Sequence, residues 1–206
     1  MEQPPKEAAW QVLDRVTAAR KSLLNAGYKP IPTNGKRPFL DSWQAIEANE
    51  AEIDNWRRQH PDALNTGVLT ATTPAIDIDV LDAAAAEELQ CALWLMIGDN
   101  GRALVRHGKR PKRAVLFQTA EPFDKIATPI FVSPNGDTHR VEVLCNGQQI
   151  VAHGIHPDTG TAYEWEGGQP GAVPRDDLPY LDAQMAGNFI AKATELMRER
   201  GWGRTC

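Results

Sequence analysis

The stretch Ala75-Ile76-Asp77-Ile78-Asp79-Val80 alternates apolar and acidic residues. Because side chains alternate across a β-strand, this pattern predicts a strand with an aliphatic face and with Asp77 and Asp79 on the opposite face. Two carboxylates this close repel each other unless one is protonated or a cation lies between them, and paired oxygen ligands suit Mg²⁺ or Mn²⁺. An exposed strand with an acidic solvent face has the same pattern. The stretch alone therefore leaves both interpretations open.

Helical and extended patterns alternate on both sides of this strand. Together they predict a mixed α/β or α+β domain with a C-terminal helix, rather than a sandwich or a helical bundle. We expect helices over residues 7–26, 49–59, 82–96 and 181–200, and strands near residue 31 and over 66–70, 75–80, 103–105, 113–119 and 163–165.

Residues 140–152 form a strong hairpin pattern centred on Asn146-Gly147. Asn-Gly readily adopts the two positive φ angles of a type I′ turn, so we expect these residues to pair as two antiparallel strands. Glu142 lies on the first of them. If the hairpin neighbours the 75–80 strand, Glu142 completes a three-carboxylate site with Asp77 and Asp79. Otherwise it is a solvated strand residue.

The segment 101–113 carries six Lys and Arg residues and no acidic residue. In a chain of formal charge -5 this segment predicts a local anion-binding site. Gly108 and Pro111 would turn the chain and present Lys112 and Arg113 at the start of the next strand, where they could bind phosphate. A solvated basic loop is the alternative.

His153 and His156 are spaced like a pair of zinc ligands. A structural zinc site needs further Cys or His ligands at suitable spacing, and His139 is the only other candidate nearby. A histidine that donates to a phosphate, or polarises a metal-bound water, fits the neighbouring acidic residues better.

Length and composition set the outer limits. The chain has 206 residues, of which 42% are hydrophobic and 24% charged, as expected for one folded domain with two lobes. Its net negative charge excludes an overall positive surface potential of the kind that attracts nucleic acid. The three cysteines lie far apart and are expected to be ordinary thiols. The sequence has no apolar run long enough for a membrane span and no secretory signal pattern, so we expect no membrane association and a cytoplasmic location.

The order of these segments resembles the N-terminal primase/polymerase (prim-pol) domain of phage- and plasmid-type replication proteins, in the archaeo-eukaryotic primase superfamily. The resemblance extends from about residue 13 to 165. It rests on 27–32, Gly35-Lys36-Arg37-Pro38, Trp43, Ile53-x-x-Trp56, 65–68, 76–79, Arg106-x-Gly108-x-x-Pro111-Lys112-Arg113, 141–144 and 154–165.

The resemblance implies a catalytic sheet like that of an RNA-recognition motif, over about residues 71–166. This sheet would pack against a smaller N-terminal α/β unit over about residues 7–70, with a C-terminal helix over about 180–200. The whole chain, 1–206, would form one two-lobed domain, with the active site in the cleft between the lobes.

The resemblance also implies roles for individual residues. Asp77 and Asp79 correspond to the first metal-binding motif, and Glu142 to the third, where Asp is commoner; the metal would be Mg²⁺ or Mn²⁺. The second motif is usually Ser-x-His but is basic here. The expected nucleotide-binding residues are Arg106, His107, Lys112, Arg113 and His156, and the expected template-binding residues are Lys36 and Arg37.

The implied function is template-dependent nucleotidyl transfer by a primase/polymerase. It would use nucleoside triphosphates, a single-stranded DNA template and primer, and a two-metal carboxylate site. A helicase domain or subunit commonly accompanies such a domain, and this sequence has no P-loop of its own. Two alternatives are a replication module that binds nucleotide or single-stranded DNA with little synthesis, and a metal-dependent nuclease.

Overall fold

The computed structural model describes residues 9–204 as four helices, two short 3₁₀ turns and twelve strands. The α-helices are α1 (Ala9–Asn25), α2 (Glu50–Gln59), α3 (Ala83–Ile97) and α4 (Ala183–Glu199). The strands are β1 (Pro30–Asn34), β2 (Arg37–Pro38), β3 (Asn65–Leu69), β4 (Ala75–Asp79), β5 (Leu104–His107), β6 (Arg113–Leu116), β7 (Ile126–Ala127), β8 (Phe131–Val132), β9 (Thr138–Leu144), β10 (Gln149–His153), β11 (Glu164–Glu166) and β12 (Gly203–Arg204). The 3₁₀ turns are η1 (Trp43–Ala45) and η2 (Arg175–Asp177).

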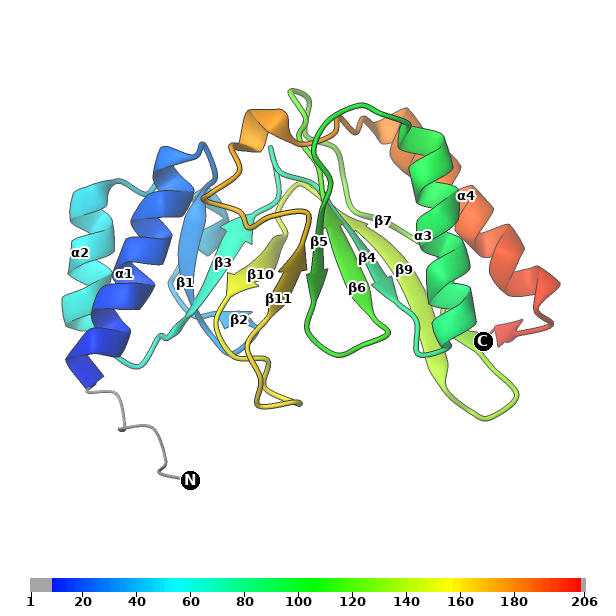
Figure 1. The fold of residues 1–206 in the computed structure, drawn as a ribbon, viewed down its shortest axis with the longest axis horizontal. Coiled ribbons are helices and arrows are strands. Elements are labelled where there is room, and N and C mark those ends of the chain that lie inside the picture. The colour runs from blue at the N-terminus through cyan, green and yellow to red at the C-terminus, as the bar shows by residue number, and fades with distance from the viewer. Residues whose placement is uncertain (1–8, 205–206) are drawn as a thin grey trace.

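The strands form two sheets. The smaller sheet has the order β10-β3-β1-β2, and the larger has the order β11-β5-β6-β4-β9-β8-β12, with β7 also paired to β9. The strand pairs within them are antiparallel. Figure 1 shows α1 and α2 at the smaller sheet's end of the molecule and α3 and α4 at the other end. The predicted α+β class with a C-terminal helix is confirmed.

Helix boundaries follow local signals in the sequence. Asn49, Asp82 and Asp182 each precede a helix, and each side chain accepts a hydrogen bond from a backbone N–H in the first turn. Such caps satisfy donors that the helix itself leaves unpaired. Gly27, with φ at 85°, follows α1 in the left-handed conformation that glycine adopts without strain.

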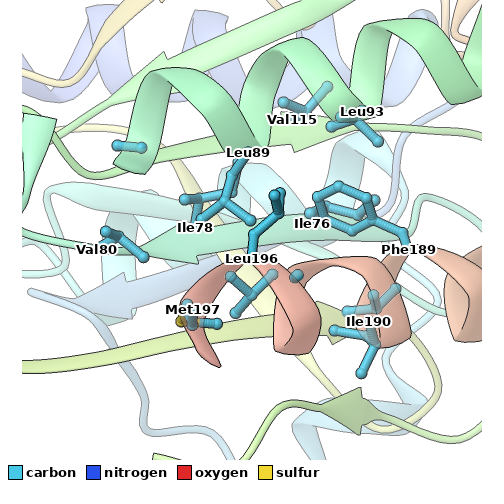
Figure 2. Close-up of a cluster of buried hydrophobic side chains, with 14 of the residues drawn as sticks. Ile76, Ile78, Val80, Leu89, Leu93, Val115, Phe189, Ile190, Leu196 and Met197 are labelled. Atoms are coloured by element: carbon cyan, nitrogen blue, oxygen red, sulfur yellow. The ribbon is translucent and has the colours of Figure 1, made fainter. Parts of the chain in front are cut away.

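The main hydrophobic core lies between the larger sheet and the helices α3 and α4. Figure 2 shows Ile76, Ile78 and Val80 of the β4 segment among side chains from both helices, including Leu89 and Phe189. All five are at most 1% exposed. This packing fixes the aliphatic face of β4 toward the helices, so its acidic face turns toward the smaller sheet.

A second apolar cluster joins the two sheets at one end. Ala75 of β4, Leu116 of β6 and Leu144 of β9 pack in the same cluster as Val68 of β3 and Ile150 of β10. Ala75 lies on the same face of β4 as Asp77 and Asp79. This face of β4 therefore packs against the smaller sheet at Ala75 and carries a carboxylate at Asp77, two residues later.

The predicted hairpin over 140–152 is wrong. Its first half, β9, pairs with β4, whereas its second half, β10, crosses to the smaller sheet and pairs with β3. Gly147 has φ at 68°, but Asn146 does not have the positive φ that a type I′ turn also needs. The two strands instead satisfy their backbone groups on different sheets. In the same way, β3 and β4 follow each other in the chain but belong to different sheets.

Several short elements lie outside the predicted set: β2, β7, β8, β12 and the two 3₁₀ turns. Each has only two or three residues, too few to show a hydrophobic period. None of the helices within residues 9–204 is both long and apolar enough to cross a membrane.

Candidate active site

A cleft of about 210 Å³ opens between the two sheets beside the acidic face of β4. Asp77 and Asp79 of β4, Arg106 of β5 and Lys112 line one side, and Gln149 and other residues of β10 line the opposite side. Five Lys and Arg residues and three Asp residues contribute to the lining, which also includes Lys36, Gly108, Lys109, Arg113, Leu144, Ile150, Val151, His156, Asp158 and Tyr163. The cleft thus combines a carboxylate pair with an excess of cations.

Asp77 is the deeper of the two carboxylates. Its removal from solvent raises the pKa of its carboxyl group, and the neighbouring Asp79 and Glu142 raise the pKa further. Arg106 and Lys112 act in the opposite direction. Asp79 is half-exposed and forms an ion pair with Lys112. The folded protein therefore holds negative charge here at a cost, and a bound cation would relieve it.

Glu142 lies directly opposite Asp77, because β4 and β9 pair in that register. Residues opposed across antiparallel strands share a face of the sheet. Its Oε1 is 2.8 Å from the Lys125 amine and 2.9 Å from the Arg140 guanidinium, and Glu142 is not part of the cleft lining. Within residues 9–204, no group of three or more His, Cys, Asp or Glu side chains is close enough together to hold a metal ion.

Arg106 is a rigidly held cation in the cleft. Its Nη1 donates to the Val151 carbonyl at 2.7 Å, and its guanidinium lies 4.9 Å from the centre of the Tyr163 ring. Its Nε is buried without a hydrogen-bond partner among the described residues. Burial lowers the pKa of Arg106, and the charge of Asp77 counteracts this. The contact with Val151 links β5 of the larger sheet to β10 of the smaller one.

His156 lines the cleft beside Tyr163, with the two ring centres 5.4 Å apart. Its Nδ1 accepts the backbone N–H of Asp158 at 3.2 Å, so the neutral ring carries its proton on Nε2. Burial lowers the pKa of His156, as does the positive charge of Lys36. A neutral His156 can therefore donate one hydrogen bond to a ligand.

An asparagine not identified from the sequence secures the other wall of the cleft. The Asn65 amide donates to the carbonyls of Gly35 and Ile155, at 3.0 and 2.8 Å, and its oxygen accepts the Ile155 N–H at 2.9 Å. These bonds hold the loops that carry Lys36 and His156. A single buried Asn at the start of a strand has no spacing pattern that would reveal this role.

The family model for the bifunctional DNA primase/polymerase N-terminal domain matches residues 20–180 of the 206. The chain belongs to this family. No curated protein matches it. The prim-pol domain identified by the resemblance is thereby confirmed, and with it the general class of DNA primase/polymerase nucleotidyl transfer.

The structure of this prim-pol domain separates two residues of the altered second motif. Lys112 reaches Asp79 in the cleft, whereas Arg113 contributes to the cleft lining but directs its guanidinium to the opposite face of the sheet. Arg113 is paired with Ile78, and it bonds to Glu87 at 3.0 Å and to Gln90, both on α3. The alternation of β6 thus assigns neighbouring cations to different surfaces.

Two other expected ligand residues also lie away from the carboxylates. His107 shares the helix-side face of β5 with Val105, and its Nε2 is 2.9 Å from Glu166. Arg37 lies on β2, outside the cleft lining, whereas its neighbour Lys36 lines the cleft and contacts Asp158 at 3.5 Å. The cleft therefore gathers Asp77, Asp79, Arg106, Lys112, His156 and Lys36.

Proposed function

We propose that this prim-pol domain transfers nucleotides from nucleoside triphosphates to a growing strand, directed by a single-stranded DNA template, in the cleft between its sheets. The observation that carries the proposal is the position of Asp77 and Asp79, side by side on one face of β4 within a cleft otherwise rich in cations. Nucleotidyl transfer needs both features, because cations must neutralise the triphosphate while carboxylates hold metal ions against it.

The carboxylates fit Mg²⁺ or Mn²⁺. Mg²⁺ commonly binds through one or two protein carboxylates and completes its coordination with water and substrate phosphates, so Asp77 and Asp79 suffice as the fixed ligands. The raised pKa of Asp77 is consistent with a site that becomes favourable when a cation is present. Bound metal ions would supply activation of the attacking hydroxyl and neutralisation of the leaving pyrophosphate.

Glu142 is proposed as a third acidic residue of the site. Its position opposite Asp77 is suitable, but its carboxylate would first have to leave Lys125 and Arg140. Glu142 is the longer homologue of the Asp that is commoner at this position, and its extra methylene gives it the reach for such a movement.

The cationic side chains are proposed to bind the triphosphate. Arg106 and Lys112 flank the carboxylates, and Lys36 and His156 lie on the loops that Asn65 holds in place. Cations that are held in place stabilise the charges of the attacking hydroxyl and of the triphosphate more than water does, because they are already oriented toward those charges. The chain's own contribution is thus position and electrostatic stabilisation.

The test is incubation with a primed template, labelled nucleotides and Mg²⁺ or Mn²⁺. Extension of the primer is expected. An unchanged primer together with nucleotide binding would favour the alternative of a binding module, and shortening would favour a metal-dependent nuclease. Comparing deoxynucleotides with ribonucleotides, and primed with unprimed templates, extends the same assay to the substrate.

A further inference from the structure

A second pocket adjoins the cleft on the far side of Gly108. It has a volume of about 290 Å³ and lies between the β5–β6 turn, residues 108–110, and the loop over residues 159–162. A water molecule occupies only about 30 Å³ in the liquid, so this space is large enough for a ligand group.

Gly108 and Lys109 line both the cleft and the second pocket. A Cβ atom added at Gly108 would lie 2.5 Å from His156 and 2.7 Å from Tyr163, so this glycine packs directly against the wall of the cleft. Only the thickness of this turn separates the two spaces. A polymer with one end at the carboxylates could therefore continue into the second pocket.

The side chains around the second pocket suit an anion. Lys109 is exposed and forms no ion pair or hydrogen bond with any residue that the structure describes. Thr159 and Thr161 contribute hydroxyls that are 2.9 Å apart, and Thr159 also donates to the Gly108 carbonyl at 3.4 Å, a bond long enough for a phosphate oxygen to replace. Lys109 and Arg110 outnumber the single carboxylate of the lining, Glu164, in a chain that is acidic as a whole.

Arg110 is available for a ligand at little energetic cost. It contacts Glu164 at 3.3 Å and Glu166 at 3.1 Å, and all three side chains are more than half exposed. Exposed ion pairs of this kind contribute about 0–1 kcal/mol. A phosphate group can therefore compete with the two carboxylates for this guanidinium.

A buried polar side chain also lines the pocket. The His107 side chain is only 3% exposed, and its Nδ1 has no hydrogen-bond partner among residues 9–204. Nε2 lies 2.9 Å from the Glu166 carboxylate but also makes no well-formed hydrogen bond; with the proton of the neutral ring on Nε2, Nδ1 is an acceptor. Buried polar atoms without partners are rare and call for an explanation. A ligand that brings both an anionic group and a hydrogen-bond donor would satisfy the whole set of side chains.

We propose that this second pocket binds one nucleotide unit of a nucleic-acid strand, with its backbone phosphate on Lys109 and Arg110. The phosphate oxygens accept from these cations and from the threonine hydroxyls, and a hydroxyl or amine of the same unit donates toward His107. The pocket then holds the strand at a fixed distance from Asp77 and Asp79. This role rests on the proposed function, because the cleft must hold the reacting end of that strand.

The first test measures binding of a labelled oligothymidylate, by fluorescence anisotropy and without nucleotide or metal, over a range of salt concentrations. For Arg110→Gln we expect weaker binding and a salt-dependence slope reduced by about 0.7, the value for one lost phosphate contact on a single strand. Lys192→Gln, which removes the same charge from α4, serves as the matched control and should leave the slope unchanged. Equal slopes for Arg110→Gln and Lys192→Gln would overturn the proposal.

The second test locates the phosphate. Oligothymidylates that each carry one neutral methylphosphonate linkage, at successive positions, are compared with the unmodified strand. In the wild-type protein one position should weaken binding most, and Arg110→Gln and Thr161→Val should abolish the extra loss at that same position. If the losses of affinity caused by the protein substitution and by the methylphosphonate are additive at every position, a defined phosphate site is excluded.

Nucleotide binding is measured separately on the same variants, with a nucleoside triphosphate and Mg²⁺. Arg110→Gln and Thr161→Val should leave this affinity unchanged. If strand binding depends on Arg110 but the protein shows no nucleotidyl transfer, the proposal for the second pocket holds and the proposed function is wrong. Loss of nucleotide affinity in both variants would instead assign these residues to the cleft and overturn the second pocket as a separate site.

Discussion

Asp77 and Glu142 face each other across the β4–β9 pair, yet the carboxylate of Glu142 is held by Lys125 and Arg140 rather than in the cleft. The register brings the third acidic residue next to the first, while the two cations pair with its carboxylate and offset part of its charge. This arrangement limits the repulsion among the carboxylates, which adds to the larger effect of burial in raising the pKa of Asp77.

Loosening the Glu142 ion pairs is expected to strengthen metal binding. Lys125→Gln removes one partner, so Glu142 can reach the cleft more easily and the Mn²⁺ concentration for half-maximal activity should fall. Glu142→Gln should be severely impaired, and Glu142→Asp should retain partial activity. Titrations of activity with Mn²⁺ measure all three, and an active Glu142→Gln variant would remove this residue from the site.

Asp77→Asn should abolish synthesis without weakening the fold. Loss of a metal ligand removes several kcal/mol of transition-state stabilisation, equivalent to at least about a hundredfold in rate. Because burial raises the pKa of Asp77, its ionised form is unfavourable in the folded state, and the neutral amide should leave the melting temperature unchanged or higher. Asp62→Asn, at an exposed position, is the control. A folded Asp77→Asn variant with normal extension would contradict the assignment.

Lys112 and Arg113 form a matched pair for testing which cation binds the triphosphate. Lys112→Ala should weaken nucleotide binding by about 1–3 kcal/mol, the scale of a lost charge-assisted hydrogen bond. Arg113→Ala should change nucleotide affinity far less, because its guanidinium contacts α3, and should mainly lower the melting temperature. Nucleotide affinity and thermal unfolding of both variants decide this, and equal losses of affinity would refute the distinction.

Asn65→Asp is expected to loosen the two loops that form one wall of the cleft. The substitution keeps the acceptor for the Ile155 N–H but removes the donors to the Gly35 and Ile155 carbonyls. Losing these two part-buried hydrogen bonds, each contributing about 0.5–1.5 kcal/mol, should lower the free energy of unfolding by about 1–3 kcal/mol. The loops carrying Lys36 and His156 should also loosen, raising the nucleotide Michaelis constant. Asn188→Asp, exposed on α4, should change neither quantity.

The stability of the fold should fall as the pH drops below about 6.5, the ordinary pKa of histidine. Burial lowers the pKa of His139, whose Nδ1 accepts the Leu81 N–H and whose Nε2 lies 2.8 Å from the Ser133 hydroxyl. The unfolded chain therefore binds a proton that the folded chain resists, so acid favours unfolding. Denaturant titrations across this range should show a shallower pH dependence for His139→Gln, and an identical dependence would exclude His139 as a contributor.

Prediction from sequence succeeded where the signal was local. The alternation in 75–80 already assigns the aliphatic and acidic faces of β4, because the pleat of a strand depends on its own backbone. The helix boundaries were equally local, since capping residues such as Asp82 and Asp182 act within one turn. The order of motifs along the chain identified the family, as the family model confirms.

Only the tertiary structure decided which strands pair and which neighbouring side chains share a surface. Asn146-Gly147 favours a hairpin locally, but β10 gains its backbone partners from β3 in the other sheet, so this turn connects the sheets and helps to form the cleft. Arg106 and His107, or Lys112 and Arg113, are adjacent in sequence and alternate between faces, but only the packing of the sheets and helices decides which member of each pair has its charged group in the cleft. The sequence alone determined the acidic strand, and long-range pairing, which no local pattern encodes, determined what faces it.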